Sequence, residues 1–138
     1  MSTQKLKWRH NSHEIKMLED NRGFLGEFEI SKLNFDFKRI YWVTVKADKK
    51  RGFHAHKELS QFLVVLSGQL EIKLDDSKNS VELLLLPGEN LLIKPGVWRE
   101  FVARETDTTI LILASREYSE QDYIRNYEEF VKWTNELL

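Results

Sequence analysis

Several residue types are missing or scarce in this chain of 138 residues, and each absence excludes a class of protein. Cysteine is absent, which excludes disulfide bonds, thiolate metal sites and a cysteine nucleophile. No apolar run approaches transmembrane length, and the polar N-terminus lacks the apolar stretch of a signal peptide. We therefore expect a cytoplasmic protein that makes no contact with a membrane.

An excess of one charge is also missing. The 21 basic and 22 acidic residues are interspersed and leave a formal net charge of -1, which gives no electrostatic footprint for nucleic acid. Hydrophobic residues make up 41% of the chain and charged residues 31%, as in folded globular proteins. The length fits one domain over residues 1–138 with a single core.

What the sequence does contain is a series of short apolar segments separated by turn signals such as Ser67-Gly68, Pro87-Gly88 and Pro95-Gly96. Their spacing predicts an all-β sandwich or barrel, preceded by an N-terminal extension over residues 1–12. The expected strands cover residues 14–18, 24–30, 38–46, 53–56, 62–66, 70–74, 81–86, 90–93, 100–103 and 108–114. Apolar and charged residues alternate over 70–74, which is typical of a strand buried on one face.

The C-terminal segment changes to a helical period. Ser119 followed by Asp122 predicts a capping box, and a helix is expected over residues 119–136. The residues on one stripe of that helix are Tyr123, Tyr127, Val131 (or Phe130) and Thr134. We interpret their aromatic rings as packing residues that lie on the barrel or on a partner subunit.

Two of the four histidines, His54 and His56, are separated by one small residue. In a strand, both side chains would point to the same face. Two imidazoles on one wall can bind a metal or transfer protons on a bound substrate. The alternative is a pair of surface histidines on a polar strand face, and the sequence pattern alone leaves both interpretations open.

The segments RGFHAH…SG and PGENLLIKPGVW resemble the two motifs of the cupin superfamily. The resemblance implies a double-stranded β-helix, a jelly-roll barrel, here with a C-terminal α-helix. Gln61 occupies the position of the metal-binding glutamate, and Val97-Trp98-Arg99-Glu100 lacks the third histidine. Since arginine repels a cation, we expect no metal, although Glu100 could in principle complete a site of two histidines and one carboxylate.

A closer resemblance, from about Asp20 to Val131, is to the nucleotide-sugar 3,4-ketoisomerases, small cupins that act on dTDP-4-keto-6-deoxy-D-glucose. The matching residues are Asn21-Arg22-Gly23, Lys38-Arg39-Ile40-Tyr41-Trp42, Arg51-Gly52-Phe53-His54-Ala55-His56-Lys57, Gln61, Ser67-Gly68, Pro95-Gly96-Val97-Trp98, Leu113-Ala114-Ser115 and Tyr118…Asp122-Tyr123-Ile124-Arg125…Tyr127…Phe130. The combination of RGFHAHK with the late DYIRxY is far more specific than a bare cupin match.

This resemblance implies an isomerase that moves the keto group from C4 to C3 through an enediol, without metal or other cofactor. His54 and His56 would be the catalytic base and acid, with the assignment between them left open. Arg51 nearby would keep both imidazoles neutral. Many members read Trp-His after the Pro-Gly turn, whereas this chain reads Trp98-Arg99. Arginine at this position goes with the gluco-configured product, so gluco is favoured over galacto.

The same resemblance implies a binding site for a dTDP-linked 4-keto-6-deoxyhexose. The diphosphate would bind arginines, with Arg39, Arg51, Arg22 and Arg99 as candidates. Alternation places Arg39 and Tyr41 on one face and Trp42 on the other, so we expect Tyr41 to stack on thymine. For Trp98 two interpretations stay open: a core residue, or a residue beside a mouth loop that forms a wall of the sugar pocket.

The resemblance also implies a homodimer, with the N-terminal strands exchanged as one arrangement, and a product used for 3-amino-3,6-dideoxysugars of a glycan such as an O-antigen or S-layer. Two other functions stay open. One is a non-catalytic cupin that only binds sugar nucleotides. The other is a dTDP-sugar 3,5-epimerase, which shares the fold but pairs one histidine with an aspartate and a tyrosine in a longer chain.

Overall fold

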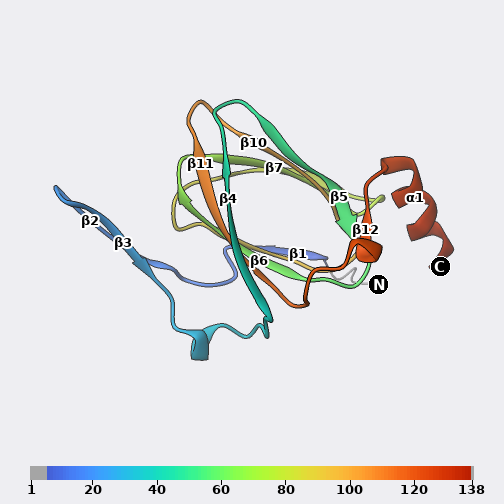
Figure 1. Cartoon of the computed structure of the whole chain (residues 1–138), viewed down its shortest axis with the longest axis horizontal. Helices are drawn as coiled ribbons and strands as arrows, with labels where there is room; N and C mark the ends of the chain where they lie inside the picture. Colours follow the sequence, from blue (N-terminus) through green and yellow to red (C-terminus); the bar gives the residue numbers. More distant parts are fainter. Residues whose placement is uncertain (1–5, 138) are drawn as a thin grey trace, which may run out of the picture.

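The computed structural model describes residues 6–137 and shows a barrel of two antiparallel sheets that face each other (Figure 1). Sheet I has the strand order β1-β9-β6-β11-β4, and sheet II has the order β12-β5-β10-β7-β8. The strands of sheet I are β1 (Trp8–His10), β9 (Asn90–Ile93), β6 (Gln61–Ser67), β11 (Thr108–Ala114) and β4 (Arg39–Val45). Those of sheet II are β12 (Tyr123–Ile124), β5 (Lys50–His56), β10 (Trp98–Ala103), β7 (Leu70–Asp75) and β8 (Ser80–Leu85). The predicted all-β jelly roll is confirmed.

The strand pattern in the sequence agrees with these boundaries. The segments 90–93 and 108–114 coincide with β9 and β11, and the other predicted strands differ from the observed ones by a few residues at their ends. Within the N-terminal extension, β1 forms an edge of sheet I by pairing with β9, with Trp8 opposite Ile93. The residues before position 6 lie outside the described part of the chain.

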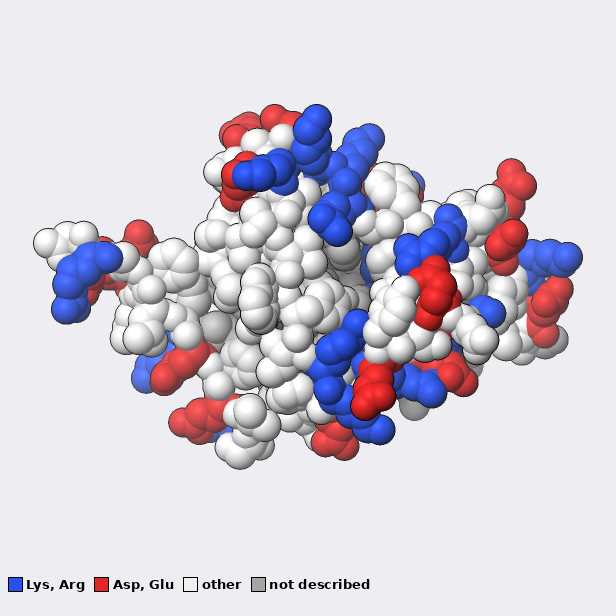
Figure 2. Space-filling model, in the orientation of Figure 1, with Lys and Arg blue, Asp and Glu red and all other residues white. Residues whose placement is uncertain are grey.

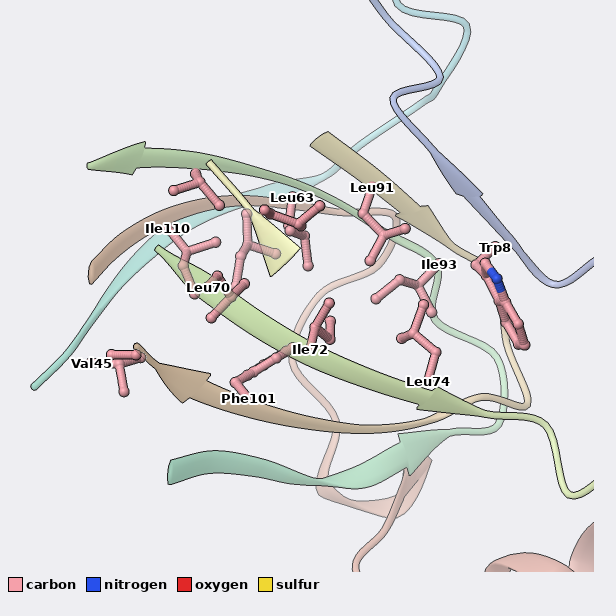
Figure 3. Packing of buried hydrophobic residues seen from close by; sticks show 14 of the residues in the cluster. Trp8, Val45, Leu63, Leu70, Ile72, Leu74, Leu91, Ile93, Phe101 and Ile110 are labelled. Atoms are coloured by element: carbon pink, nitrogen blue, oxygen red, sulfur yellow. The ribbon is translucent and has the colours of Figure 1, made fainter. Parts of the chain in front are cut away.

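The main core fills the space between the two sheets (Figure 3). Leu70, Ile72 and Leu74 of β7 are fully buried there, as their alternation with charged residues predicted. They pack against aliphatic side chains from the facing sheet, such as Leu63 of β6 and Leu91 of β9. This apolar layer is what closes the barrel, because burial of apolar surface is the dominant favourable contribution to folding.

A two-stranded hairpin, β2 (Lys16–Asp20) and β3 (Gly23–Glu27), projects from the barrel at the end opposite the C-terminal helix (Figure 1). Its turn is at Asn21-Arg22, and Arg22 donates to the Asp20 carboxylate at 2.6 Å. The short 3₁₀ helix η1 (Ile30–Lys32) follows. The predicted strand over 24–30 therefore ends early, at Glu27.

The predicted helix over 119–136 is wrong in its first half. The structure has a 3₁₀ helix, η2 (Glu120–Asp122), then the short strand β12, and only then the helix α1 (Tyr127–Glu136). The side chain of Asn126 caps α1 by accepting the backbone N–H of Glu129 at 3.0 Å. The predicted cap fails because the Ser119 side chain makes no capping hydrogen bond.

The apolar side of α1 covers the outer face of sheet II. Phe130 is fully buried and packs with Ala55, Trp98 and Ile124. The helix is thus a packing element, as predicted for residues 127–134, whereas Tyr123 belongs to a strand. No helix within residues 6–137 has the length and apolarity needed to cross a bilayer.

Candidate active site

A cavity of about 270 Å³ lies between the two sheets. Sheet I contributes Tyr41, Val43, Gln61, Ile110 and Ile112 to its wall, and sheet II with the segment after it contributes Arg51, Gly52, His54, Phe101, Tyr123 and Arg125. Figure 2 shows a hollow on one face of the molecule with lysine and arginine side chains gathered around it. A polar cavity surrounded by cations suits an anionic ligand.

Strand β5 carries both histidines and is irregular just before them. Gly52 has φ +92° and Phe53 has φ +61°, and the pairing of β5 with β10 shifts register at Arg99/Glu100. Beyond this bulge the strand brings His54 and His56 to the same side, with their ring centroids 4.9 Å apart. The predicted common wall is confirmed. His54 lines the cavity, whereas His56 is fully buried behind it.

The short segment η2–β12 packs against the two histidines. The ring of Tyr123 lies 5.0 Å from that of His54 and 4.4 Å from that of His56, measured between centroids. Asp122 Oδ2 lies 2.9 Å from His56 Nδ1, and its Oδ1 accepts the backbone N–H of Glu58 at 2.6 Å. The sequence interpretation placed Asp122 and Tyr123 on a helix and missed both. The DYIR motif was the signal that could have identified them.

Arg99 is completely buried next to the cavity-lining residue Gln61 and does not itself line the cavity. The sequence interpretation named it as a candidate for binding the diphosphate, whereas the structure buries it completely. Its Nη1 donates to Gln61 Oε1, and its Nη2 donates to the Val97 carbonyl at 2.8 Å. Gln61 in turn donates from Nε2 to the Tyr41 hydroxyl at 2.6 Å. A hydrogen-bonded chain therefore joins sheet II to sheet I across the site.

Both imidazoles are held in the neutral form. Burial, followed by the charge of the nearby Arg99 cation, lowers the pKa of His54 to about 4. Burial followed by the charge of Arg99 lowers the pKa of His56 to about 2. The sequence interpretation expected Arg51 to keep the imidazoles neutral. Arg51 does line the cavity, but it is not among the groups that lower the pKa of His54 or His56. Neutral imidazoles can accept protons near neutral pH.

Arg39 and Tyr41 share a face, as alternation predicted. The Arg39 guanidinium lies 4.8 Å from the centre of the Tyr41 ring and 5.7 Å from that of Tyr118. Within residues 6–137, its Nε and Nη2 atoms are buried and have no hydrogen-bond partner. Unpaired guanidinium donors beside a cavity are suited to phosphate oxygens, which accept planar paired hydrogen bonds.

Arg125 is a further cation on the cavity wall that sequence reasoning did not single out. It lies 4.1 Å from the centre of the Tyr123 ring, and its Nε donates to Glu120 Oε1 at 2.7 Å. Glu120 also accepts from the Tyr118 hydroxyl at 2.5 Å. Glu120 therefore holds Arg125 beside the aromatic wall of the site.

Two predicted substrate-binding residues are not brought to this cavity. Trp98 lies on the outer face of sheet II, where it packs against Phe130 and donates from Nε1 to Glu100 at 2.9 Å. Arg22 lies at the tip of the projecting hairpin with 85% of its side chain exposed. Strand alternation explains the placement of Trp98, because its neighbour Arg99 occupies the inward position.

The same alternation turns Glu100 away from the histidines and towards Trp98, so it does not complete a site of two histidines and one carboxylate. Among the described residues, no three histidine, aspartate or glutamate side chains are grouped so that they could hold a metal ion. Apart from Asp122, which is paired with His56 Nδ1, the polar side chains around the histidines are arginines, tyrosines and an amide, and these do not form a common metal site.

Residues 9–135 match the family model FdtA, described as WxcM-like, C-terminal. A curated relative, TDP-4-oxo-6-deoxy-alpha-D-glucose-3,4-oxoisomerase of Aneurinibacillus thermoaerophilus, is 40% identical over 122 residues, which is 86% of this chain and 88% of the relative.

Solved structures that are similar to this chain also include 3,4-ketoisomerases. A 3,4-ketoisomerase from Helicobacter canadensis is 36% identical with a TM-score of 0.81, over 95% of this chain and 99% of the other. QdtA, a sugar 3,4-ketoisomerase from Thermoanaerobacterium thermosaccharolyticum solved with TDP, is 34% identical with a TM-score of 0.82, over 96% and 97%.

Proposed function

The chain belongs to the family of the sugar-nucleotide 3,4-ketoisomerases, and we propose that it converts dTDP-4-keto-6-deoxy-D-glucose into the 3-keto isomer. The observation that carries the proposal is the pair of neutral imidazoles, His54 and His56, beside a cavity whose wall contains aromatic rings and arginines. This arrangement supplies proton acceptors for the sugar and cations for the diphosphate.

We propose that His54 is the base that meets the sugar, since it lines the cavity and His56 lies behind it. His54 takes the proton from C3, the C3–H electron pair forms a C3–C4 double bond, and the C4 oxygen gains a proton. The resulting enediol loses the proton of the C3 oxygen while C4 gains one, which leaves the carbonyl at C3. The reaction is redox-neutral, and every proton that leaves the sugar is matched by one that returns.

The arginines of the site are suited to stabilise the negative charge of the diphosphate and the negative charge that develops on the sugar during this reaction. Arg99 is fixed by Gln61 and the Val97 carbonyl, so its charge is pre-organised beside the two imidazoles. A fixed cation stabilises an enediolate without reorganisation during the reaction. Arg39, with its unpaired donors, and Arg51 are proposed to bind the diphosphate, and Tyr41 to stack on thymine. We assign Trp98 and Arg22 no contact with the substrate within one chain.

We further propose that the product has the gluco configuration at C4. The support is Arg99, the residue that goes with this outcome in the resemblance to the family, and its buried position beside His54. The product would then be a substrate for an amino transfer to C3, as 3-amino-3,6-dideoxysugar biosynthesis requires. The expected cytoplasmic location stays a prediction.

A homodimer is proposed as the working form. The outer face of sheet I exposes Ile40 (52%) and Trp42 (70%), and the projecting hairpin exposes Leu18, Phe24 and Leu25. Exposed apolar surface of this extent marks an interaction site. A second copy covering sheet I with its hairpin would bury both sets of residues.

The direct test is incubation with dTDP-4-keto-6-deoxyglucose in D₂O, followed by NMR of the sugar protons. We expect a 3-keto product with deuterium at C4. The same reaction in H₂O keeps H4, and its coupling to H5 gives the C4 configuration. His54→Asn should abolish the labelling, while His10→Asn, which changes a surface histidine of β1, should retain it.

The alternatives give different results in the same experiment. Deuterium at C3 and C5 of a product that keeps its 4-keto group would identify a 3,5-epimerase. Binding of the nucleotide without any label in the sugar would identify a non-catalytic cupin. Either result would overturn the proposed isomerase.

A further inference from the structure

His56 has two ring nitrogens in different surroundings. Nδ1 lies 2.9 Å from Asp122 Oδ2, whereas Nε2 is buried and has no hydrogen-bond partner among the described residues. A carboxylate oxygen accepts hydrogen bonds and does not donate them, so the proton of a neutral His56 must be on Nδ1. Nε2 then carries a free lone pair inside the protein.

Asp122 is itself fixed. Its Oδ1 accepts the backbone N–H of Glu58 at 2.6 Å, just beyond the end of β5, and the N–H of Lys57 donates to the Asp122 carbonyl at 3.0 Å. The backbone carbonyl of His56 accepts the N–H of Gly96 at 2.8 Å. The carboxylate and the imidazole are therefore both anchored through main-chain hydrogen bonds, which limits their relative motion.

Two aromatic rings also pack against His56. Tyr123, the residue after Asp122, lies 4.4 Å from His56 between ring centroids, and His54 lies 4.9 Å away. One short segment thus holds His56 from two sides, with a carboxylate at Nδ1 and a phenol ring against the imidazole. The ring cannot turn over without breaking these contacts.

The charges around His56 explain why a carboxylate is needed there. The cations that act on His56 are Arg99, Arg39 and Arg125, and each disfavours an imidazolium. Asp122 is the acidic side chain in direct contact with the ring. A histidine among several arginines needs such a counter-charge if it is to take up a proton during turnover.

We propose that Asp122 is a positioning residue for the isomerisation, which holds His56 as the Nδ1–H tautomer and so keeps its Nε2 lone pair as the proton acceptor behind His54. The inference rests on the proposed function for its catalytic consequence, but the tautomer is a property of the resting protein. Asp122 touches no substrate and acts only through His56.

The first arm of the test measures the tautomer directly. NMR of the protein labelled with ¹⁵N-histidine distinguishes protonated from unprotonated ring nitrogens, and His56→Asn assigns the signals. We expect His56 to carry its proton on Nδ1 between pH 6 and 8. A proton on Nε2 would overturn the proposal, whether or not the protein shows isomerase activity.

The second arm uses Asp122→Asn, which keeps the size of the side chain and can present an N–H to Nδ1. We expect His56 to lose its preference for Nδ1–H and kcat to fall about 10²- to 10⁴-fold, with KM little changed. Asp107→Asn is the matched control, because Asp107 also accepts a backbone N–H, that of Ala47 at 2.8 Å, but contacts no histidine among the described residues.

Two results of this arm would contradict the proposal. One is an unchanged tautomer in Asp122→Asn, and the other is a changed tautomer with full kcat. If the variant does not fold, the tautomer of the wild-type protein still decides the proposal. If the wild-type protein lacks isomerase activity, the proposed function fails while the tautomer assignment is judged separately.

Discussion

Arg99 and Gln61 join the two sheets across the interior of the barrel: Arg99 Nη1, from β10, donates to Gln61 Oε1, from β6. In the general cupin pattern, position 61 carries a metal-binding glutamate, whereas here the amide holds an arginine beside two histidines. Arg99 is completely buried, and after burial of the imidazoles its positive charge is the next cause that lowers the pKa of His54 and His56.

Replacement of this cation is expected to change the pH dependence of the reaction. Burial and then the charge of Arg99 lower the pKa of His54 to about 4, so the base is neutral above that pH and activity is lost as the pH falls through it. In Arg99→Gln the pKa should rise, and the acid limb of kcat/KM should move to higher pH. The measurement is a pH profile of isomerisation followed by NMR.

Arg104→Gln is the control for that profile, since Arg104 follows the same strand but pairs with Glu71 on the surface. Its acid limb should coincide with that of the wild-type protein. An unchanged limb in Arg99→Gln would contradict the assigned electrostatic effect.

The buried histidines should also make stability depend on pH. The folded-state pKa values, about 4 for His54 and about 2 for His56, lie below the unfolded value of 6.5, so the unfolded chain binds protons first as the pH falls. The free energy of unfolding should therefore fall below pH 6.5, by up to about 1.4 kcal/mol per pH unit for each histidine. Urea unfolding between pH 7 and 4.5 measures this slope, and His54→Gln should reduce it. An identical slope in the variant would contradict the shift.

The backbone of Gly52 lies so close to that of Arg99 that position 52 is expected to tolerate no side chain. Gly52 has φ +92°, and a Cβ there would lie 2.9 Å from the Arg99 carbonyl oxygen. Gly23 has φ +135° with open space around it, so it shares the left-handed strain without the contact. Gly52→Ala should lower the unfolding midpoint more than Gly23→Ala and should also lower kcat, because it moves the β5–β10 pairing beside His54. Equal effects of the two variants in thermal unfolding and kinetics would contradict this.

If the proposed dimer forms through the outer face of sheet I, a charged substitution on that face should dissociate it. Trp42→Glu places a charge at a side chain that is 70% exposed, and it should halve the mass measured by light scattering after size-exclusion chromatography. Leu84→Glu, at an exposed leucine of β8 in sheet II, should leave the mass unchanged. A wild-type protein with the mass of one chain would refute the dimer itself.

Local sequence patterns were sufficient to predict most of the fold. The alternation of Leu70, Ile72 and Leu74 with charged residues depends only on the period of two in a strand, and the structure buries all three residues. The same period placed His54 beside His56 and Tyr41 beside Arg39. These relationships hold between residues two apart, so no tertiary information was required.

The C-terminal segment shows where such patterns fail. Ser119 and Asp122 have the spacing of a helix cap, but Asp122 instead contacts His56, which is 66 residues away in the chain. That contact and the pairing of Tyr123 with His56 across β12 and β5 extend the backbone, so the helix begins later, at Tyr127. A local propensity of a fraction of a kcal/mol per residue yields to several tertiary contacts.

The sequence by itself therefore determined the strands, their buried faces and the two histidines on one wall, because period and turn chemistry act over a few residues. Only the tertiary structure decided that Arg99 is a buried cation, that Trp98 packs under α1, and that Asp122 and Tyr123 enclose His56. These features depend on which strands become neighbours, and burial and charge are properties of that assembly, which no segment of the chain possesses alone.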